Sequence, residues 1–311
     1  MTPTPRVRGV VYGTGGGVYH VRLDSGDVVE ASLRGRLKLE KRTGDKVVIG
    51  DQVEVVPLGD GWTVERVLER TGELVRRGVG GRRAKVVVAN VDRVLAVVAA
   101  RDPDPSPAAV DRLLVIAEAS RVHPVLVVNK VDLEGGRETA ASLARLYEPI
   151  GYRVLAMSAA TGEGMDAVAA EICHGVSALM GPSGAGKSSI LNCLHPALAL
   201  RTGDLSRRTG RGRHTTVSAR LIPLECGGVV ADTPGFGDVG MWGVGISEVA
   251  RCFPEIAPLE AGCRFRGCAH HREPDCAVRR AVGTGAVAES RYRSYVTLRE
   301  EAAAAEAQHA R

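Results

Sequence analysis

The feature that most constrains the fold of this chain is a glycine-rich segment, Gly181 to Ser188. Its sequence, GPSGAGKS, matches the pattern GxxxxGK[ST], and it stands between an apolar stretch, Val176–Met180, and a helical pattern that begins at Lys187. Glycines in such a loop allow backbone N–H groups to close on phosphate oxygens, and the N-terminus of the next helix adds positive potential. The segment therefore predicts a strand, a phosphate-binding loop and a helix in succession, as in a parallel α/β sheet.

The alternative for this segment is an ordinary glycine-rich turn, and the strand-to-helix context argues against it. Lys187 would contact the β- and γ-phosphates and act in catalysis, while the Ser188 hydroxyl would be a ligand of Mg²⁺. The candidate phosphate-binding residues are Gly181, Pro182, Ser183, Gly184, Ala185, Gly186, Lys187, Ser188 and Ser189.

A second motif, Asn129-Lys130-Val131-Asp132, follows the apolar stretch Pro124–Val128 and indicates which base is bound. The Asp132 carboxylate can accept hydrogen bonds from N1 and the exocyclic amine of guanine. Adenine lacks that amine and presents an acceptor at N1, so the carboxylate would be left unpaired at a cost in binding free energy. Asn129 and the stem of Lys130 would support the base.

A third motif, Ser158-Ala159-Ala160-Thr161-Gly162, follows the next strand-like stretch, Tyr152–Ala156. Here we expect a backbone N–H near Ala159 to meet guanine O6, and Ser158 and Ala159 are the candidate nucleotide-binding residues. The second and third motifs together predict that the base is guanine.

Two later segments complete the predicted nucleotide site. Asp232-Thr233-Pro234-Gly235 ends a further apolar strand, so Asp232 would hold Mg²⁺ through water and the Gly235 N–H would meet the γ-phosphate. The loop Thr209–Thr216 carries hydroxyls at Thr215 and Thr216. One of the two should complete the metal shell, and the sequence leaves both open.

Apolar strand patterns alternate with helical patterns through the middle of the chain. Strands are predicted at Arg93–Ala99, Pro124–Val128, Tyr152–Ala156, Val176–Met180 and Gly228–Ala231, and helices at Pro107–Ser120, Arg137–Ile150, from Met165 and from Lys187. Such alternation indicates a doubly wound, largely parallel sheet. Ligands of these sheets bind at the carboxyl ends of the strands, which is where each motif falls.

Residues 6–69 read instead as five short strands separated by turns. They are Val7–Tyr12, Val18–Leu23, Val28–Leu33, Gln52–Val56 and Trp62–Leu68. This count fits an OB-fold barrel, although periodicity alone leaves an SH3-like barrel open. The barrel offers few aromatic side chains for stacking on bases, so any binding to RNA would depend on charge and shape.

Composition adds information about partners and compartment. The net charge is +5, and two arginine-rich stretches interleaved with glycine could bind phosphate backbones or could be a solvated face. The first stretch contains Arg70, Arg76, Arg77, Arg82, Arg83 and Lys85, and the second contains Arg207, Arg208, Arg211 and Arg213. No segment has the length of apolar residues that a membrane span needs, and the N-terminus has no apolar centre of a signal peptide. We therefore expect no membrane partner and a cytoplasmic location, where thiols stay reduced.

Three cysteines and a histidine lie close together after the sheet region. Cys263, Cys268, His270 and Cys276 have the ligand types and the spacing of a closed, structural zinc site, and His271 could replace His270 on spacing alone. Disulfides and chance clustering are the alternatives. A segment with little core of its own would depend on the metal to fold. We expect the remaining thiols to behave as small core hydrophobes, and they are Cys173, Cys193, Cys226 and Cys252.

His214 is a candidate catalytic residue in the loop that carries Thr215. Most GTPases have a water-orienting glutamine after the DxxG motif, and here Phe236 takes that place. Another group must then position the water, or hydrolysis must be slow. The alternative for His214 is a solvated loop histidine.

The order of the motifs along the chain is unusual. Ordinary GTPases present the P-loop, the switch threonine and DxxG before NKxD and SAx, whereas here NKxD and SAx come first. A parallel sheet tolerates such a circular permutation because the old termini lie close together and can be joined.

This order, together with Asp104-Pro105-Ser106-Pro107, Gly181–Ser189 and Arg213-His214-Thr215-Thr216, resembles the ribosome-small-subunit-dependent GTPase A family (RsgA, also called YjeQ). The resemblance implies an N-terminal OB-fold (residues 1–70), a circularly permuted P-loop GTPase domain (71–240) and a C-terminal, α-rich zinc-binding domain (241–311). It also implies His270 as the zinc ligand and His214 as the catalytic histidine.

The resemblance further implies a function. The expected protein is a GTPase that binds GTP and GDP with Mg²⁺, carries one structural Zn²⁺ and acts as a monomer. It would bind the small ribosomal subunit and its rRNA, assist late maturation and be stimulated by the subunit. The first alternative is a nucleotide-gated RNA-binding scaffold with negligible turnover. The second is a small-molecule kinase, which would have no use for NKxD and DTPG together.

Overall fold

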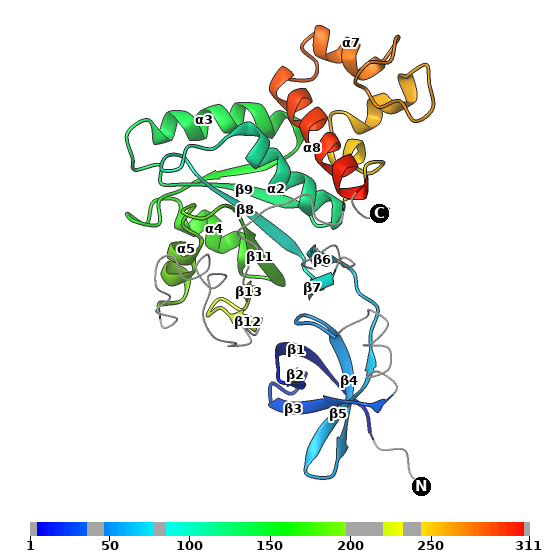
Figure 1. The fold of residues 1–311 in the computed structure, drawn as a ribbon. Coiled ribbons are helices and arrows are strands. Elements are labelled where there is room, and N and C mark those ends of the chain that lie inside the picture. The colour runs from blue at the N-terminus through cyan, green and yellow to red at the C-terminus, as the bar shows by residue number, and fades with distance from the viewer. Residues whose placement is uncertain (1–4, 36–46, 77–84, 197–219, 233–243, 308–311) are drawn as a thin grey trace.

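The chain folds into a small β-barrel, an α/β sheet and a C-terminal helical module, which follow one another in space as they do in sequence (Figure 1). The structure is a computed structural model, and it describes residues 5–35, 47–76, 85–196, 220–232 and 244–307. Several sequence predictions lie outside the described residues, and they concern Arg77, Arg82, Arg83, the loop Thr209–Thr216 with His214, the second arginine stretch, Gly235 and Phe236.

The five predicted N-terminal strands close into a barrel of the OB type. They are β1 (Val7–Gly15), β2 (Val18–Leu23), β3 (Val28–Leu33), β4 (Gln52–Leu58) and β5 (Gly61–Val67). Their order is β1-β2-β3-β5-β4, and an additional β1–β4 pairing closes the barrel. The parallel pairing of β3 with β5 distinguishes this barrel from an SH3-like one. Alternate residues such as Val21, Val53 and Val55 fill its interior and are fully buried.

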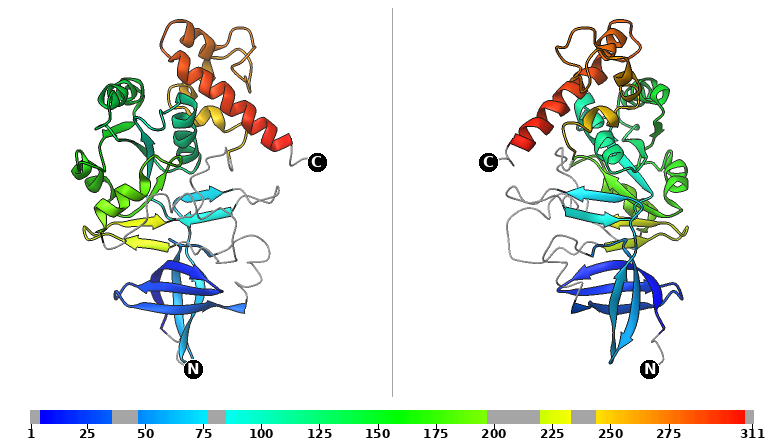
Figure 2. Two further views of the ribbon diagram at one scale, coloured as in Figure 1. Left: turned by 60° about the vertical axis from the view of Figure 1, so that its left-hand side comes forward. Right: turned by 90° about the vertical axis from the view of Figure 1, so that its right-hand side faces the viewer.

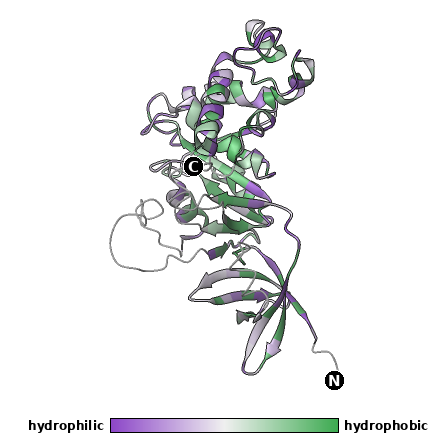
Figure 3. Cartoon of the chain, turned by 45° about the vertical axis from the view of Figure 1, so that its right-hand side comes forward, coloured by the Kyte–Doolittle hydropathy of each residue, from purple (hydrophilic) through white to green (hydrophobic). Residues whose placement is uncertain are grey.

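The middle of the chain forms the predicted parallel sheet. Its parallel strands lie in the order β10 (Arg153–Ala156), β9 (Pro124–Asn129), β8 (Arg93–Ala99), β11 (Val176–Met180) and β13 (Val229–Asp232). These strands are the most consistently hydrophobic part of the chain in Figure 3, as expected of a sheet covered on both faces.

One strand of this sheet was not predicted. It is β12 (Arg220–Pro223), which runs antiparallel to β13 and also meets β1 through the pair Gly13 and Arg220. Because of that pair the barrel and the α/β sheet are continuous, in a single sheet of 11 strands.

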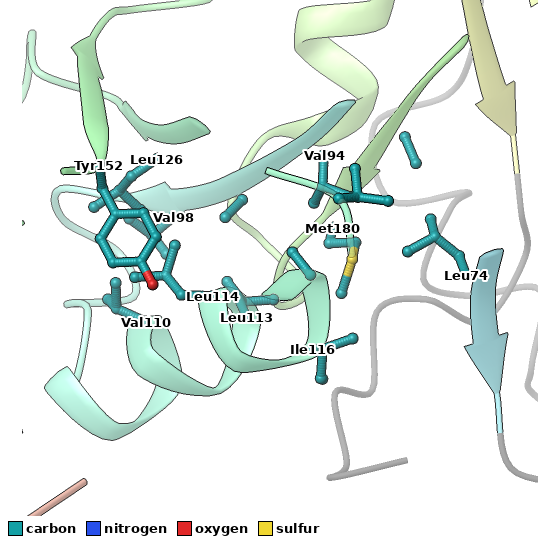
Figure 4. Close-up of a cluster of buried hydrophobic side chains, with 14 of the residues drawn as sticks. Leu74, Val94, Val98, Val110, Leu113, Leu114, Ile116, Leu126, Tyr152 and Met180 are labelled. Atoms are coloured by element: carbon teal, nitrogen blue, oxygen red, sulfur yellow. The ribbon is translucent and has the colours of Figure 1, made fainter. Parts of the chain in front are cut away.

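Helices cover both faces of the α/β sheet. On one face lie α2 (Pro107–Ala119) and α3 (Gly136–Tyr147), and on the other lie α4 (Met165–Ile172) and α5 (Lys187–Leu194). Successive residues of β8 divide between the two cores: Val94, Ala96 and Val98 face α2, while Leu95 and Val97 face α4 and α5. Figure 4 shows the first core, with Leu113, Leu114 and Ile116 of α2 packed toward Val94, Val98 and Met180.

A short two-stranded sheet, β6 (Glu73–Arg76) and β7 (Lys85–Ala89), lies between the barrel and the α/β sheet (Figure 2). Next to it, Arg70 donates to both carboxylate oxygens of Asp51, over 2.7 and 2.9 Å, and Asp51 is fully buried. The inclusion of Arg70 in a basic, phosphate-facing loop is therefore wrong, because its guanidinium neutralises a buried carboxylate.

The C-terminal module consists of short 3-10 turns, including Val249–Cys252 and Ala257–Gly262, followed by α7 (Ala277–Gly283) and α8 (Glu289–Ala307). Phe253, Ile256, Tyr295 and Leu298 form a buried cluster that also contains Val115 of α2. The expectation that this segment has little core of its own is wrong, since α8 packs its buried face against these residues. No helix in the described ranges combines the length and the apolar character that crossing a bilayer requires.

The cysteines outside the proposed zinc cluster also differ from expectation. Contrary to the expectation that the thiols stay reduced, Cys173, after α4, forms a disulfide with Cys226 in the β12–β13 turn, and Cys193 is exposed. Of these four cysteines, all within the described ranges, Cys252 alone is a buried free thiol as predicted. The disulfide pair is separated by 53 residues, so nothing in the local sequence brings the two cysteines together.

Candidate nucleotide and zinc sites

The phosphate-binding loop depends on glycines that other side chains could not replace. A Cβ on Gly181 would lie 2.0 Å from the carbonyl oxygen of Val97, and one on Gly186 would lie 2.0 Å from Nδ2 of Asn129. Gly184 and Gly186 also have φ values of +81° and +93°, in the region that favours glycine. The loop therefore lies close against β8 and against the NKxD motif.

Lys187 is the first residue of α5 and points back into the loop. Its ammonium donates to the carbonyl oxygens of Gly181, over 2.6 Å, and Pro182, over 2.8 Å. Burial lowers its pKa to about 8. Ser188 is buried in the same first turn, while Ser183 and Gly184 are exposed at the top of the loop. A buried cation among backbone groups at a helix N-terminus is suited to bind phosphate.

Asn129 joins the three loops of the site. Its Nδ2 donates to the carbonyl oxygen of Ala185 in the P-loop over 2.9 Å, and its Oδ1 accepts from the backbone N–H of Ala159 over 3.0 Å. The N–H that we expected to meet guanine O6 is therefore engaged by Asn129 in this structure. Guanine would have to share or displace that hydrogen bond.

Ser158 shapes the third loop from inside. It is fully buried, and its Oγ accepts from the backbone N–H groups of Ala160 and Thr161, each over 3.2 Å. Its own backbone N–H donates to the carbonyl oxygen of Glu163 over 2.8 Å. The loop is thus a tight turn whose conformation is defined by one serine.

The NKxD segment is a turn in which Lys130 is held by a hydrogen bond, whereas Asp132 is exposed to solvent. Lys130 has a φ of +64° and donates from Nζ to the carbonyl oxygen of Asp102, in the segment after β8. Val131 is buried and its N–H donates to the carbonyl oxygen of Met157 over 3.2 Å. Asp132 is exposed, and within the described ranges its carboxylate has no hydrogen bond or ion pair. It is available to a ligand.

Asp232 ends β13 next to the P-loop strand. Ala231 pairs with Ala178 of β11, so the backbone of Asp232 lies beside the last residues before Gly181. The P-loop, NKxD, SAx and the start of DTPG therefore meet at the carboxyl edge of one sheet. Thr215, Thr216 and Gly235 lie outside the described residues, so their predicted contacts stay predictions.

The Cys/His cluster brings four candidate ligand atoms within 4.8 Å of one another, from Cys263, Cys268, His270 and Cys276. The sulfurs of Cys263 and Cys276 are 3.9 Å apart, and Nδ1 of His270 is 3.5 Å from each. A tetrahedral zinc ion with ordinary bond lengths requires about 3.8 Å between sulfurs and about 3.5 Å between sulfur and nitrogen. The geometry therefore fits zinc, and it places His270 rather than His271 among the cysteines.

Groups around the cluster orient its ligands. Tyr292 and Tyr295 of α8 donate to the carbonyl oxygens of His270 and Ala269, over 2.8 and 2.9 Å. The Glu273 carboxylate accepts from the backbone N–H groups of Ala269, His271 and Arg272, which flank His270. Although partial burial raises the pKa of Glu273, these hydrogen bonds lower it to about 2. These hydrogen bonds orient the backbone that carries the four candidate ligands.

Sequence reasoning missed two arginines near these sites. Arg101 joins two loops beside the NKxD motif, and Arg291 joins α8 to α2. Neither belongs to a motif, and the partners of Arg291 are 36 and 180 residues away along the chain. Nothing in the sequence around either arginine indicates which residue its side chain contacts.

A doubly wound sheet that carries NKxD and SAx before the P-loop and DTPG defines the class of circularly permuted P-loop GTPases. Two solved structures support this class over nearly the whole chain. YjeQ from Thermotoga maritima superposes with a TM-score of 0.80 at 33% identity, over 96% of this chain and 99% of that one. YloQ, described as a circularly permuted GTPase, superposes with a TM-score of 0.74 at 30% identity, over 96% of each chain.

Sequence comparison gives the family. The family model described as RsgA GTPase matches residues 67–242. A relative from Gemmatimonas aurantiaca, named small ribosomal subunit biogenesis GTPase RsgA, is 47% identical over 96% of this chain and 98% of its own length. One of the same name from Moorella thermoacetica is 42% identical over 94% and 96%. The chain belongs to the RsgA GTPase family and is a GTPase, which confirms the resemblance stated from the motifs.

Proposed function

We propose that this GTPase binds the small ribosomal subunit and its rRNA and assists subunit biogenesis, with hydrolysis stimulated by the subunit. Support comes from relatives named small ribosomal subunit biogenesis GTPase RsgA, which match 94–96% of the chain. The observation on which the nucleotide site depends is the position of Asn129, whose side chain contacts both the P-loop and the SAx loop.

The residues of the site have complementary proposed roles. Lys187 leaves its carbonyl partners to contact the phosphates, and Ser188 and Asp232 hold Mg²⁺, which neutralises charge on the β- and γ-phosphates. Asp132 recognises the N1 and amine edge of guanine. Gly235 and one of Thr215 and Thr216 complete the γ-phosphate and metal contacts.

His214 is proposed to orient the attacking water when the subunit orders its loop. The isolated protein would then turn over slowly, because Phe236 stands where a water-orienting glutamine is expected. The cluster around His270 would hold one structural Zn²⁺, since its four ligands leave no open position. We further propose a monomer that acts in the cytoplasm, where ribosomal subunits are assembled.

The test is multiple-turnover phosphate release from GTP with and without purified small ribosomal subunits. We expect slow release alone and a large increase on adding subunits. The scaffold alternative predicts GTP-dependent binding to subunits with no increase in release, and that result would reject the proposed stimulation.

A further inference from the structure

Arg101 lies two residues beyond β8, where its side chain bridges two separate turns. Its NH1 donates to Oδ2 of Asp104 over 2.7 Å, and its Nε donates to the carbonyl oxygen of Glu134 over 3.3 Å. The guanidinium also lies against Gly135, since a Cβ there would be 2.6 Å from NH2. The side chain is half-buried between the segment after β8 and the turn after NKxD.

Each of these turns carries a group of the guanine site. In the first, the carbonyl oxygen of Asp102 accepts from Lys130. In the second, Asp132 lies two residues before Glu134, inside a turn closed by a hydrogen bond from the N–H of Leu133 to the carbonyl oxygen of Lys130, over 3.2 Å. Arg101 therefore connects the segment whose Asp102 carbonyl oxygen holds Lys130 to the turn that carries Asp132.

The first turn also lies next to the P-loop. A Cβ on Gly184 would be 3.4 Å from Cδ of Pro103, which is ordinary van der Waals contact. The segment from Arg101 to Asp104 is thus bounded by the P-loop on one side and by the NKxD turn on the other. A displacement of this segment would therefore alter the positions of P-loop and NKxD residues in the nucleotide site.

The direction of the Asp132 carboxylate depends largely on its backbone. Among the described residues no hydrogen bond or ion pair holds this side chain, which interacts with Arg137 only through its charge. We infer that Arg101 is a positioning residue for guanine recognition: by tying the Glu134 carbonyl to the Asp102 segment, it presets Asp132 for the edge of the base. Preorganisation of this kind raises affinity because less ordering remains to be done on binding. The inference rests on the proposed role of Asp132.

The experiment compares equilibrium binding of GTP and ITP, whose hypoxanthine base lacks the exocyclic amine. Arg101→Ala should weaken GTP binding about fivefold to tenfold and ITP binding less than about twofold, so discrimination between them falls. Turnover at saturating GTP should stay within about twofold of the parent, since the phosphate groups are untouched. Arg101→Lys should lose discrimination as well, because an ammonium lacks the fork that reaches both Asp104 and the Glu134 carbonyl.

Arg145→Ala is the matched control, because Arg145 is exposed on α3 and its substitution removes the same charge as Arg101→Ala does. It should leave the GTP-to-ITP ratio unchanged. Equal weakening of GTP and ITP binding by Arg101→Ala, or no weakening of either, would overturn the inference.

Asp132→Asn in the same assay separates the inference about Arg101 from the proposed base recognition by Asp132. If Asp132→Asn reduces discrimination and Arg101→Ala does not, only the inference about Arg101 fails. If neither does, the proposed base recognition fails as well.

Discussion

Arg291 of α8 donates from NH1 to Oδ1 of Asp111 in α2 over 2.6 Å, and both side chains are buried, with 1% and 0% of their surface exposed. The same guanidinium donates to both carboxylate oxygens of Glu255, over 2.6 and 3.1 Å, and lies 4.5 Å from the ring centroid of Phe253. Tyr147 of α3 donates to the same Asp111 oxygen over 2.5 Å. The C-terminal module is therefore joined to α2 and α3 through one cation, and Figure 1 shows α8 beside α2.

Removing that cation should be costly. Arg291→Met should lower the free energy of unfolding by about 3–5 kcal/mol, because it leaves the Asp111 and Glu255 carboxylates buried without a counter-charge. Urea unfolding and the rate of proteolysis of the C-terminal module measure the effect. Arg293→Ala is the control, since its pair with Glu289 is exposed on the same helix and should cost less than about 1 kcal/mol. A similar loss of unfolding free energy in both variants would contradict the role of Arg291 as the buried counter-charge.

Loss of zinc should unfold the ligand loop but not the whole module. Cys268→Ser or Cys276→Ser should reduce bound zinc from one per chain to nearly none, and hydrogen exchange should increase between residues 262 and 276. α8 should stay protected because Tyr295 and Leu298 have a core of their own, and GTP binding should persist. Cys252→Ala, a buried cysteine outside the cluster, should keep its zinc. Metal analysis that finds much less than one zinc in the parent protein would reject the site.

GTP binding should take up a proton above about pH 8. Burial lowers the pKa of Lys187 to about 8 in the free protein, so the amine is largely neutral at higher pH. Phosphate favours the ammonium and raises that pKa in the complex, so affinity should fall as the pH rises above 8 and stay level below it. Calorimetry near pH 9 in two buffers of different ionisation enthalpy measures the proton. Lys187→Arg should show no such uptake, because arginine stays charged; an identical buffer dependence in both proteins would contradict the prediction.

His214→Ala should keep GTP affinity and subunit binding while losing most of the subunit-stimulated turnover. Orientation of the attacking water in GTPases is worth roughly 10²–10⁵ in rate, so the loss should be easy to detect. Single-turnover hydrolysis with saturating small subunits is the measurement. Stimulation to the parental rate would show that His214 is only a loop residue.

Asp132→Asn should weaken GTP binding and shift preference toward xanthosine triphosphate, whose C2 oxygen can accept from the new amide. Competition binding with GTP and xanthosine triphosphate detects the exchange. Binding of GTP at parental affinity would mean that the base is recognised elsewhere.

The sequence alone determined the elements that depend on neighbours along the chain. The strand Val176–Met180, the glycines of the P-loop and the helix from Lys187 were predicted at their observed positions because their conformations follow from spacing and glycine content. The four proposed zinc ligands lie within fourteen residues of one another, so their spacing was informative as well. The permuted order of the motifs already indicated the RsgA family, and the family model and relatives confirm it.

Which distant groups meet depends on how the elements pack in three dimensions. Arg70 reads as a surface cation in sequence and is paired with the buried Asp51 in the fold, and Arg291 finds Asp111 across 180 residues. The edge strand β12 and its contact with β1 depend on how the barrel sits on the sheet. Spacing along the chain reports local conformation, whereas a charge pair or an edge pairing depends on which surfaces are buried together, and that is settled when the elements pack.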